Sequence, residues 1–421
     1  MHLRSWHVIV VAVLACAALV APVLPSATYL TMGTASLVSG AVALSLMAFG
    51  PVLAARWPPV ESAFGGLDRI YLAHKWLGIW ALTFASFHLL FKAGASGWDT
   101  AAIFALPGGW GRFVRQLSFV GLMVIVLLAL NRNIPYGIWR WWHKLSGPIF
   151  IVVVLHWLSI KQPLPLGSPA GLWLAIVSAL GIVAALYKLL LYPFLARHAE
   201  YRVVAINPGA ASMHLQLEPV TKGVDFRPGQ FGFLRMKEDG LREPHPFTIA
   251  SGGGGQGRVD FVIRNLGDFT GKLIASTRVG MGADIYAPYG RFARRTDAGR
   301  EAWIAGGVGI SPFIAWLQDE HAQGLERVTL FYFYTPGREF PSATVLETMA
   351  RTRGAEFVPV PHGPTDPAFV GRFTALCHAG DPRALDVAFC GPRGLLAAVR
   401  KLLQANDVPQ ENLRYELFEF R

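Results

Sequence analysis

Four histidines lie within two apolar stretches of the N-terminal half: His74 and His88 in the first, His143 and His156 in the second. A buried imidazole needs partners for its ring nitrogens, and ionisable groups are costly inside a membrane, where they usually serve a function. Such pairs are typical of metal ligation, and a metalloporphyrin between two helices takes one imidazole from each. The alternative is four separate core histidines, each satisfied by its own hydrogen bonds.

The spacing within each pair predicts where the ligands lie. On an α-helix, the fourteen residues from His74 to His88 give a rise of roughly 21 Å along nearly one face. The thirteen residues from His143 to His156 give roughly 20 Å. Two neighbouring helices would therefore offer one ligand pair near each side of a membrane. The second pair is roughly 140° out of phase on an ideal helix, so we expect irregular helix geometry around Gly147-Pro148.

Composition divides the chain into two parts. Its 421 residues allow two or three domains, and the long apolar runs behind its 53% hydrophobic content are confined to residues 1–195. The net charge of +11 comes without a basic stripe with interleaved aromatic residues, so we expect no nucleic-acid partner. Basic loops inside a membrane and phosphate-bearing cofactors explain the charge better. The three cysteines imply no disulfide framework.

Hydropathy predicts six membrane-spanning helices in the first part. They cover residues 5–22, 30–53, 70–91, 115–131, 140–160 and 170–194. The first resembles a signal peptide, but no clear small-residue cleavage site follows it, so we expect a retained helix. The bias of basic residues places both termini and the whole second part in the cytoplasm, with the helices in the inner (plasma) membrane.

Short segments of alternating character open the second part and are typical of strands. They cover residues 201–206, 212–218, 230–236 and 258–264, followed by a helix over residues 268–278. Several short strands with one helix predict a small β-barrel that carries a helix. The segment His245-Pro246-Phe247-Thr248 lies between the third and fourth of these strands.

Strands and helices alternate from residue 300 onward, which predicts a parallel sheet covered by helices. The strand 301–305 leads into Gly306-Gly307-Val308-Gly309-Ile310-Ser311-Pro312-Phe313, which opens a helix. Glycines let the backbone approach a pyrophosphate, and a helix N-terminus favours its charge, although the order departs from the usual dinucleotide fingerprint. A second such turn, Cys390-Gly391-Pro392-Arg393, follows the strand 386–389.

The ordered set of these motifs resembles the NADPH oxidase and ferric reductase superfamily, and most of all its compact prokaryotic NADPH oxidases. The resemblance extends from about residue 30 to the end of the chain. It implies a membrane α-helical bundle of six spans with two hemes, joined to a cytosolic ferredoxin-reductase-like module. The implied domains are a transmembrane heme-binding domain (1–197), an FAD-binding β-barrel domain (198–297) and an NAD(P)H-binding α/β domain (298–421).

The same resemblance implies FAD, two b-type hemes and NADPH (or NADH) as cofactors. His74 with His143 would ligate the inner heme, and His88 with His156 the outer one. The residues implied for FAD are His245, Pro246, Phe247, Thr248, Arg264, Gly267 and Thr270.

The residues implied for the coenzyme phosphates are Gly306, Gly307, Gly309, Ser311 and Pro312, and those beside the nicotinamide are Cys390, Gly391 and Pro392. Phe418 would stack on the flavin, with Phe420 as the alternative. Coenzyme preference stays open. A 2′-phosphate commonly takes an arginine, and Thr335 and Arg338 follow the second strand of the α/β domain. The family usually has that arginine directly after the strand, so Arg338 could equally be a solvated loop residue.

The implied activity is that of a transmembrane NAD(P)H oxidase that produces superoxide on the outer side. Its partners would be membrane lipid and oxygen or a ferric chelate, with no obligatory activator subunit. Oxidases of the family have a further histidine one turn beyond the outer ligand, where this chain has Lys92. They also have an arginine at the outer end of the second span, where this chain has Tyr29-Leu30-Thr31. A ferric-chelate reductase and an electron-donor subunit for an outer-face protein or quinone are therefore alternatives, as is a heme-free transporter with a soluble cap.

Overall fold

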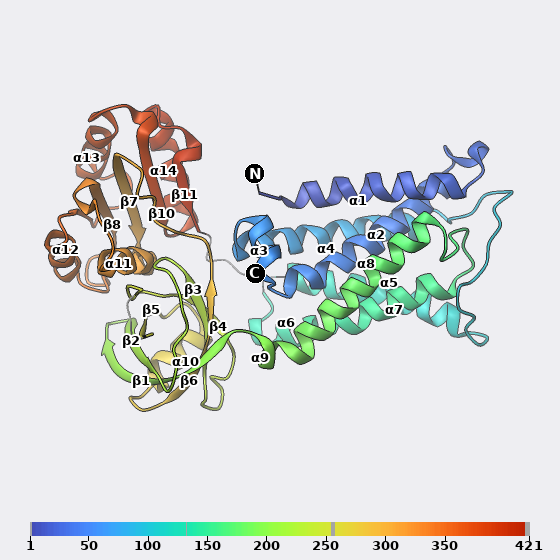
Figure 1. Ribbon diagram of the computed structural model, residues 1–421, viewed down its shortest axis with the longest axis horizontal. Coiled ribbons are helices and arrows are strands. Elements are labelled where there is room, and N and C mark those ends of the chain that lie inside the picture. Colours follow the sequence, from blue (N-terminus) through green and yellow to red (C-terminus); the bar gives the residue numbers. More distant parts are fainter. Residues whose placement is uncertain (1, 132, 254–256, 417–421) are drawn as a thin grey trace. The chain divides into compact units, whose positions relative to one another are not determined.

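A computed structural model describes residues 2–131, 133–253 and 257–416. The chain divides into two compact units, one ending at Leu195 and the other beginning at Ala196 (Figure 1). The first unit is helical, and the second contains both β-sheets. This division follows the change from apolar to ordinary globular composition in the sequence.

The N-terminal unit is a bundle of helices that run side by side (Figure 1). α2 lies at its centre and packs against α1, α4 and α8. Large apolar side chains such as Leu14, Leu127 and Ile176 are exposed on the outer helix faces, as expected of surfaces that contact lipid. The helices are α1 (Ser5–Val20), α2 (Met32–Ala54), α3 (Pro58–Phe64), α4 (Leu67–Leu90), α5 (Trp110–Leu130), α6 (Tyr136–His143), α7 (Ser146–Ser159), α8 (Pro169–Leu186), the π-helical turn η3 (Tyr187–Leu191) and α9 (Tyr192–Leu195).

Four helical segments are long and apolar enough to cross a membrane: Ser5–Val23, Met32–Ala54, Trp110–Leu130 and Pro169–Leu195. The other two predicted spans, α4 and the α6–α7 pair, do not reach this standard. α4 has sufficient length, but its histidines and Lys75 lower its hydropathy. α7 has only 14 residues. The chain is a membrane protein. That it has six membrane-spanning helices stays a prediction.

The predicted irregular geometry between His143 and His156 is confirmed. α6 ends at His143 and α7 begins at Ser146, with a turn at the two residues between them. Pro148 explains the position of this break, because its nitrogen carries no hydrogen for the carbonyl oxygen of Lys144 four residues earlier. Proline is tolerated in the first turn of the new helix, where the backbone N–H groups lack partners within the helix.

The C-terminal unit begins with a six-stranded antiparallel sheet in the order β4-β3-β6-β1-β2-β5. An antiparallel bridge between Ile249 and Phe261 joins the ends of this sheet, as expected of a barrel. The barrel core is apolar and includes the fully buried side chains of Tyr201 and Leu215. The elements are β1 (His198–Pro208), β2 (Ser212–Pro219), β3 (Phe231–Met236), β4 (His245–Thr248), β5 (Val259–Arg264), α10 (Asp268–Ser276) and β6 (Gly282–Tyr289).

A five-stranded parallel sheet in the order β11-β10-β7-β8-β9 follows, with helices packed against it (Figure 1). Strands are added on one side of β7 and then on the other, so the topological switch point lies between β7 and β10. The elements are β7 (Arg300–Gly306), η4 (Gly307–Ile310), α11 (Ser311–Gln318), β8 (Val328–Phe333), α12 (Ala343–Thr352), β9 (Glu356–Val360), α13 (Pro367–His378), β10 (Leu385–Cys390), α14 (Arg393–Ala405) and β11 (Leu413–Tyr415).

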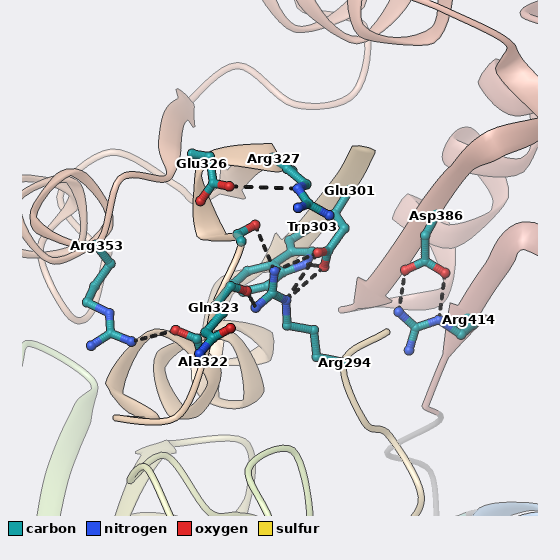
Figure 2. A network of polar contacts seen from close by, with 11 residues as sticks. Arg294, Glu301, Trp303, Ala322, Gln323, Glu326, Arg327, Arg353, Asp386 and Arg414 are labelled. Carbon is teal, nitrogen blue, oxygen red and sulfur yellow. Dashed lines mark hydrogen bonds and ion pairs between the residues drawn. The ribbon is translucent and has the colours of Figure 1, made fainter. Parts of the chain in front are cut away.

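The connection from the barrel to the parallel sheet is fixed by a buried ion pair (Figure 2). Arg294 donates to both carboxylate oxygens of Glu301, at 2.7 to 3.2 Å, and to the carbonyl oxygens of Gln323 and Gly324. The Trp303 indole N–H donates to the same carboxylate at 3.0 Å. The side chains of Arg294 and Glu301 are only 8% and 1% exposed, so both charges are removed from water together.

Replacing Arg294 by methionine should destabilise the C-terminal unit, because Glu301 would keep its buried charge without the cation. Breaking such a pair costs about 3–5 kcal/mol, which lowers the melting temperature by on the order of 10 °C. Thermal unfolding of the purified chain, followed by tryptophan fluorescence, measures this. Arg327→Ala is the matched control, because Arg327 pairs with Glu326 at the surface, where ion pairs contribute about 0–1 kcal/mol. Equal melting temperatures for the two variants would contradict the prediction.

Candidate cofactor-binding sites

The two histidines of α4 are held by backbone carbonyl groups of α2. His74 Nδ1 lies 3.0 Å from the carbonyl oxygen of Gly50, and His88 Nδ1 lies 2.9 Å from that of Ser36. A carbonyl oxygen only accepts, so Nδ1 is the donor in both rings. An imidazole that donates through Nδ1 can present Nε2 to a metal, the arrangement found when a metal-ligating histidine is oriented by a second partner.

The fourteen-residue spacing occurs on both helices, from Ser36 to Gly50 and from His74 to His88. Small residues on α2 allow the rings to approach its backbone. A Cβ at Gly40 would lie 2.9 Å from His88 Nδ1, and one at Gly50 would lie 3.7 Å from His74 Cε1. Glycine at position 40 is thus a requirement of the His88 position.

His143 lies opposite His74. The two ring centroids are 5.9 Å apart, and the ring planes make an angle of 77°. Two imidazoles on opposite sides of one metal, with metal–nitrogen bonds of about 2.0–2.1 Å, need a centroid separation of about 6 Å. The Nδ1 atom of His143 is buried and has no hydrogen-bond partner in the described chain. His156 lies within electrostatic range of His88 and Arg115. The geometry of His74 and His143 therefore fits one metalloporphyrin, and a second between His88 and His156 stays a prediction.

α4, which carries His74 and His88, makes little direct backbone contact with α6 and α7, which carry His143 and His156. α4 packs against α2, and α7 packs against α5. A Cβ at Gly78 of α4 would meet open space, whereas one at Gly147 would lie 2.8 Å from Leu189 Cδ1. Phe150 is buried, and a Cβ at Gly181 of α8 would lie 2.8 Å from its ring. Gly147 and Phe150 thus serve helix packing. Gly78, in contrast, faces open space, because no atom lies within 4 Å of a Cβ at this position.

The two sequence motifs implied for FAD meet on the barrel. His245 of β4 stacks on Phe269 of α10, with ring centroids 3.5 Å apart and nearly parallel planes. Thr248 is buried at the other end of β4, opposite Phe231. β4 and the start of α10 therefore form one continuous surface that presents both motifs.

Thr270 orders the turn that begins α10. Its hydroxyl accepts hydrogen bonds from the backbone N–H groups of Leu266 and Gly267 and donates to the Gly267 carbonyl oxygen. This geometry gives Thr270 a positioning role for the helix N-terminus, which favours an anion. A Cβ at Gly267 would meet no atom within 4 Å, so the turn is open. Arg264, at the end of β5, is exposed.

The two glycine-containing turns of the parallel sheet meet at its switch point. A Cβ at Gly309 would lie 2.2 Å from the Cys390 carbonyl oxygen, and one at Gly306 would lie 2.7 Å from Pro392 Cδ. A Cβ at Gly391 would lie 3.2 Å from Gly306 Cα. These glycines are thus required by close backbone packing between the turns, which also forms the crevice expected for a dinucleotide.

Gly307 differs from these glycines, because its φ of +56° is a left-handed conformation and its backbone borders a cavity. Ser311 and Pro312 are buried in the first turn of α11. The Ser311 hydroxyl donates to the Val308 carbonyl oxygen at 2.8 Å. These two residues therefore shape the glycine turn, with the Ser311 hydroxyl already engaged.

Cys390 is fully buried at the end of β10. Burial raises the pKa of its thiol well above the usual range, and the Glu416 carboxylate raises it further. The thiol is therefore protonated at neutral pH and is not a nucleophilic thiolate.

A cavity of about 150 Å³ brings together three of the predicted site residues, Arg264, Gly307 and Arg338. Tyr332 also lines it, and burial raises the pKa of this phenol to about 12, so it stays protonated. Thr335 is exposed and does not line this cavity, although its carbonyl oxygen accepts from the Arg338 N–H at 2.9 Å. Phe418 and Phe420 lie outside the described residues.

Comparison with known proteins gives two family matches and several relatives. Residues 39–154 match the ferric reductase like transmembrane component, and residues 202–293 match the oxidoreductase FAD-binding domain. The reductase component of propane 2-monooxygenase from Rhodococcus jostii (strain RHA1) is 30% identical over 234 residues, 52% of this chain and 62% of that protein. A flavohemoprotein from Pseudomonas aeruginosa is 26% identical over 234 residues, 48% of this chain and 54% of that protein.

Among solved structures, the flavohem-like FAD/NAD-binding domain of nitric oxide dioxygenase from Vibrio cholerae O1 biovar El Tor aligns with a TM-score of 0.44 and 20% identity. It covers 52% of this chain and 97% of that domain. The chain spans less than two thirds of the length of the curated relatives named above. It joins a ferric reductase-like transmembrane domain to an oxidoreductase FAD-binding domain, and by this combination it matches the NADPH oxidase and ferric reductase superfamily.

Proposed function

We propose that this protein is a transmembrane NAD(P)H oxidase that passes electrons to oxygen on the outer side and forms superoxide. The observation that carries the proposal is the pair of α4 histidines oriented by α2 carbonyl groups, with His143 facing His74 at 5.9 Å. Structural core histidines need no such common orientation. In the proposal, His74 with His143 would hold one b-type heme, and His88 with His156 would hold the other.

The bound cofactors would supply the redox chemistry, namely hydride acceptance by FAD and single-electron transfer through the hemes. The protein would bind these cofactors and set their positions relative to one another. The four imidazoles would hold both hemes through the protein's own side chains, so the protein would leave no iron position for oxygen, and the acceptor would be reduced without binding iron. β4 and the start of α10 would hold FAD, and the switch-point turns would hold NAD(P)H. No acid–base pair is required, and Cys390, protonated and buried, would shape the nicotinamide position.

The relatives support this division of work. The propane 2-monooxygenase relative is a reductase component, and a relative from Burkholderia cepacia is an electron transfer component of 2-halobenzoate 1,2-dioxygenase. The FAD-binding family match covers residues 202–293, so the C-terminal half would serve as the NAD(P)H-oxidising module. Basic loops favour a cytoplasmic position for it in a plasma-membrane protein. Phe418 is proposed to stack on the flavin.

Specific observations also support two other electron acceptors, a ferric chelate and a partner of an electron-donor subunit. Lys92 stands where the oxidases have a histidine, and its side chain is exposed just beyond the end of α4. This departure favours a ferric-chelate reductase, because a surface cation near the outer heme would attract anionic chelates. The names of the relatives favour an electron-donor subunit, because both are components of larger systems.

Replacing Gly40 by alanine should selectively weaken the outer heme. The new Cβ would lie 2.9 Å from His88 Nδ1, so the ring must turn and lose its bond to the Ser36 carbonyl oxygen. Loss of such an orienting partner costs about 10- to 100-fold in metal affinity. The reduced-minus-oxidised spectrum and heme per chain measure the effect. Gly111→Ala is the control, because a Cβ there meets no atom within 4 Å. Two hemes retained at dilution in the Gly40 variant would argue against the His88 assignment.

Superoxide dismutase separates the acceptors. If oxygen accepts the electron, NAD(P)H-dependent reduction of added cytochrome c should fall by most of its value when the dismutase is added. A ferric reductase would give a rate with chelated iron that is insensitive to the dismutase. An electron-donor subunit would be slow with both and would accelerate when its outer-face partner or a quinone is supplied. Dismutase-insensitive turnover therefore rejects the oxidase proposal.

A further inference from the structure

The end of the bundle that leads into the C-terminal unit carries a group of basic and aromatic side chains. α8 continues there through the π-helical turn η3 into α9 (Figure 1). Arg56, just beyond the end of α2, donates hydrogen bonds to the Tyr71 hydroxyl at 2.9 Å and to the Tyr192 hydroxyl at 3.0 Å. With their neighbours on α6 and η3, these residues form a basic–aromatic cluster, which consists of Arg56, Tyr71, Arg140, Tyr187, Lys188 and Tyr192.

The Lys188 ammonium is the member of this cluster that lacks an acceptor. Lys188 Nζ is buried, and within the described chain it has no hydrogen-bond partner and no ion pair. It lies 3.6 Å from the centroid of the Tyr192 ring. A ring face attracts a cation, but it does not replace acceptors for the three N–H groups of an ammonium. Buried charges in proteins are normally paired, so Lys188 requires an anion that the described chain does not supply.

Two further basic groups lie close to this amine. Arg56 and Arg140 are both within electrostatic range of Lys188. Like charges repel one another, most of all where burial reduces the screening by water. The side chains of Arg56 and Arg140 are only half-buried, so the cluster reaches the protein surface. An anion that arrives from the surface would therefore compensate all three basic groups at once.

A lysine near the end of a membrane helix usually has another role. Its side chain extends along the helix and places the ammonium in water. Lys188 instead keeps Nζ buried, although Leu190 and Leu191 of the same turn are 60% and 48% exposed. This turn is π-helical, a rare geometry that frequently occurs at functional sites. η3 thus holds Lys188 in the cluster, beside an apolar surface of the kind that contacts lipid.

The aromatic side chains indicate the depth of the cluster in the membrane. Tyrosine and tryptophan are enriched where a membrane meets water. The ring centroids of Trp57 and Tyr187 are 5.8 Å apart, and those of Tyr187 and Tyr192 are 6.2 Å apart. The candidate span Pro169–Leu195 ends beside these rings. The cluster therefore lies at the level of the lipid headgroups.

Phosphate is the anion that phospholipids present at this level, and guanidinium groups match its oxygens in geometry as well as in charge. Basic pockets between membrane helices bind anionic headgroups. We propose that Arg56, Arg140 and Lys188 bind the phosphate group of one anionic phospholipid. These residues come from the end of α2, from α6 and from η3, so one headgroup would connect three elements. The inference goes beyond the proposed function and requires neither the coenzyme nor an electron acceptor.

The test measures lipid binding to the purified full chain in a neutral detergent. Native mass spectrometry during titration with phosphatidylglycerol counts the bound lipids and gives their affinity, and phosphatidylcholine, which has no net charge, is the reference lipid. The wild-type chain should bind one phosphatidylglycerol more tightly than phosphatidylcholine. Lys188→Met should weaken phosphatidylglycerol binding by about tenfold, the loss of a charge-assisted hydrogen bond, and should weaken phosphatidylcholine binding less.

Lys144→Met is the matched control. Lys144 Nζ lies 4.5 Å from the centroid of the Trp141 ring, so Lys144 makes the same kind of contact as Lys188, but its side chain is exposed. This variant should bind phosphatidylglycerol with wild-type affinity. Lys188→Arg keeps a positive charge at the site and should retain most of the affinity that Lys188→Met loses.

Thermal unfolding separates lipid binding from a purely structural role. Without anionic lipid, Lys188→Met should melt at or above the wild-type temperature, because it removes an uncompensated buried basic group. Excess phosphatidylglycerol should raise the wild-type melting temperature by mass action and should raise that of the variant much less. A variant that melts below the wild type without lipid would show that Lys188 supports the fold itself, and would contradict the proposal.

Wild-type affinity for phosphatidylglycerol in Lys188→Met overturns the proposal, as does equal affinity of the wild-type chain for the two lipids. An equal rise in melting temperature with inorganic phosphate alone would assign the cluster to a free anion and overturn the lipid assignment. Loss of heme from Lys188→Met with lipid binding retained would overturn it too, because the basic groups would then hold the carboxylates of a heme. A wild-type chain that binds lipid as expected but contains no heme would contradict only the proposed function.

Discussion

The membrane unit depends on the requirement that a polar group buried in apolar surroundings must be hydrogen-bonded. Ser36 and Gly50 offer carbonyl oxygens that already accept within α2, and each uses a second lone pair for a histidine of α4. Two such contacts fourteen residues apart fix how far α4 slides along α2 and how it rotates. The register of the central helix pair and the orientation of both rings are thus set together.

The break between α6 and α7 completes this arrangement on the opposite side. A continuous helix would place His143 and His156 on different faces, and Pro148 interrupts it just after His143. The His143 ring can then face His74 independently of the His156 ring. The interruption shortens α7 below the length of a membrane span, and polar residues lower the hydropathy of α4, so neither helix is among the four candidate spans.

Sequence reasoning was most successful where side-chain periodicity and special residues act locally. The paired histidines, the helix break and most strands follow from spacing, hydropathy and proline. β6 was missed, because Gly282 and Pro288 disfavour a strand, yet it lies between β3 and β1. The uses of the glycines were equally hidden, since Gly307 borders a cavity while Gly309 packs against Cys390. These roles depend on which distant segments meet, and spacing along the chain contains no such information.

The composition of the membrane unit also limits what can cross it. Up to residue 195, the sequence contains only three acidic residues, Glu61, Asp68 and Asp99. Glu61 lies in the short helix α3, Asp68 in the first turn of α4 and Asp99 between α4 and α5. Proton relays through membranes are built from chains of carboxylates and histidines, and here the four central histidines are proposed to be occupied as ligands. Electrons would therefore cross without protons, so each turnover would separate charge. The opposing membrane potential costs about 2.3 kcal/mol per electron for each 100 mV, which sets a limit on the rate unless another protein returns the charge.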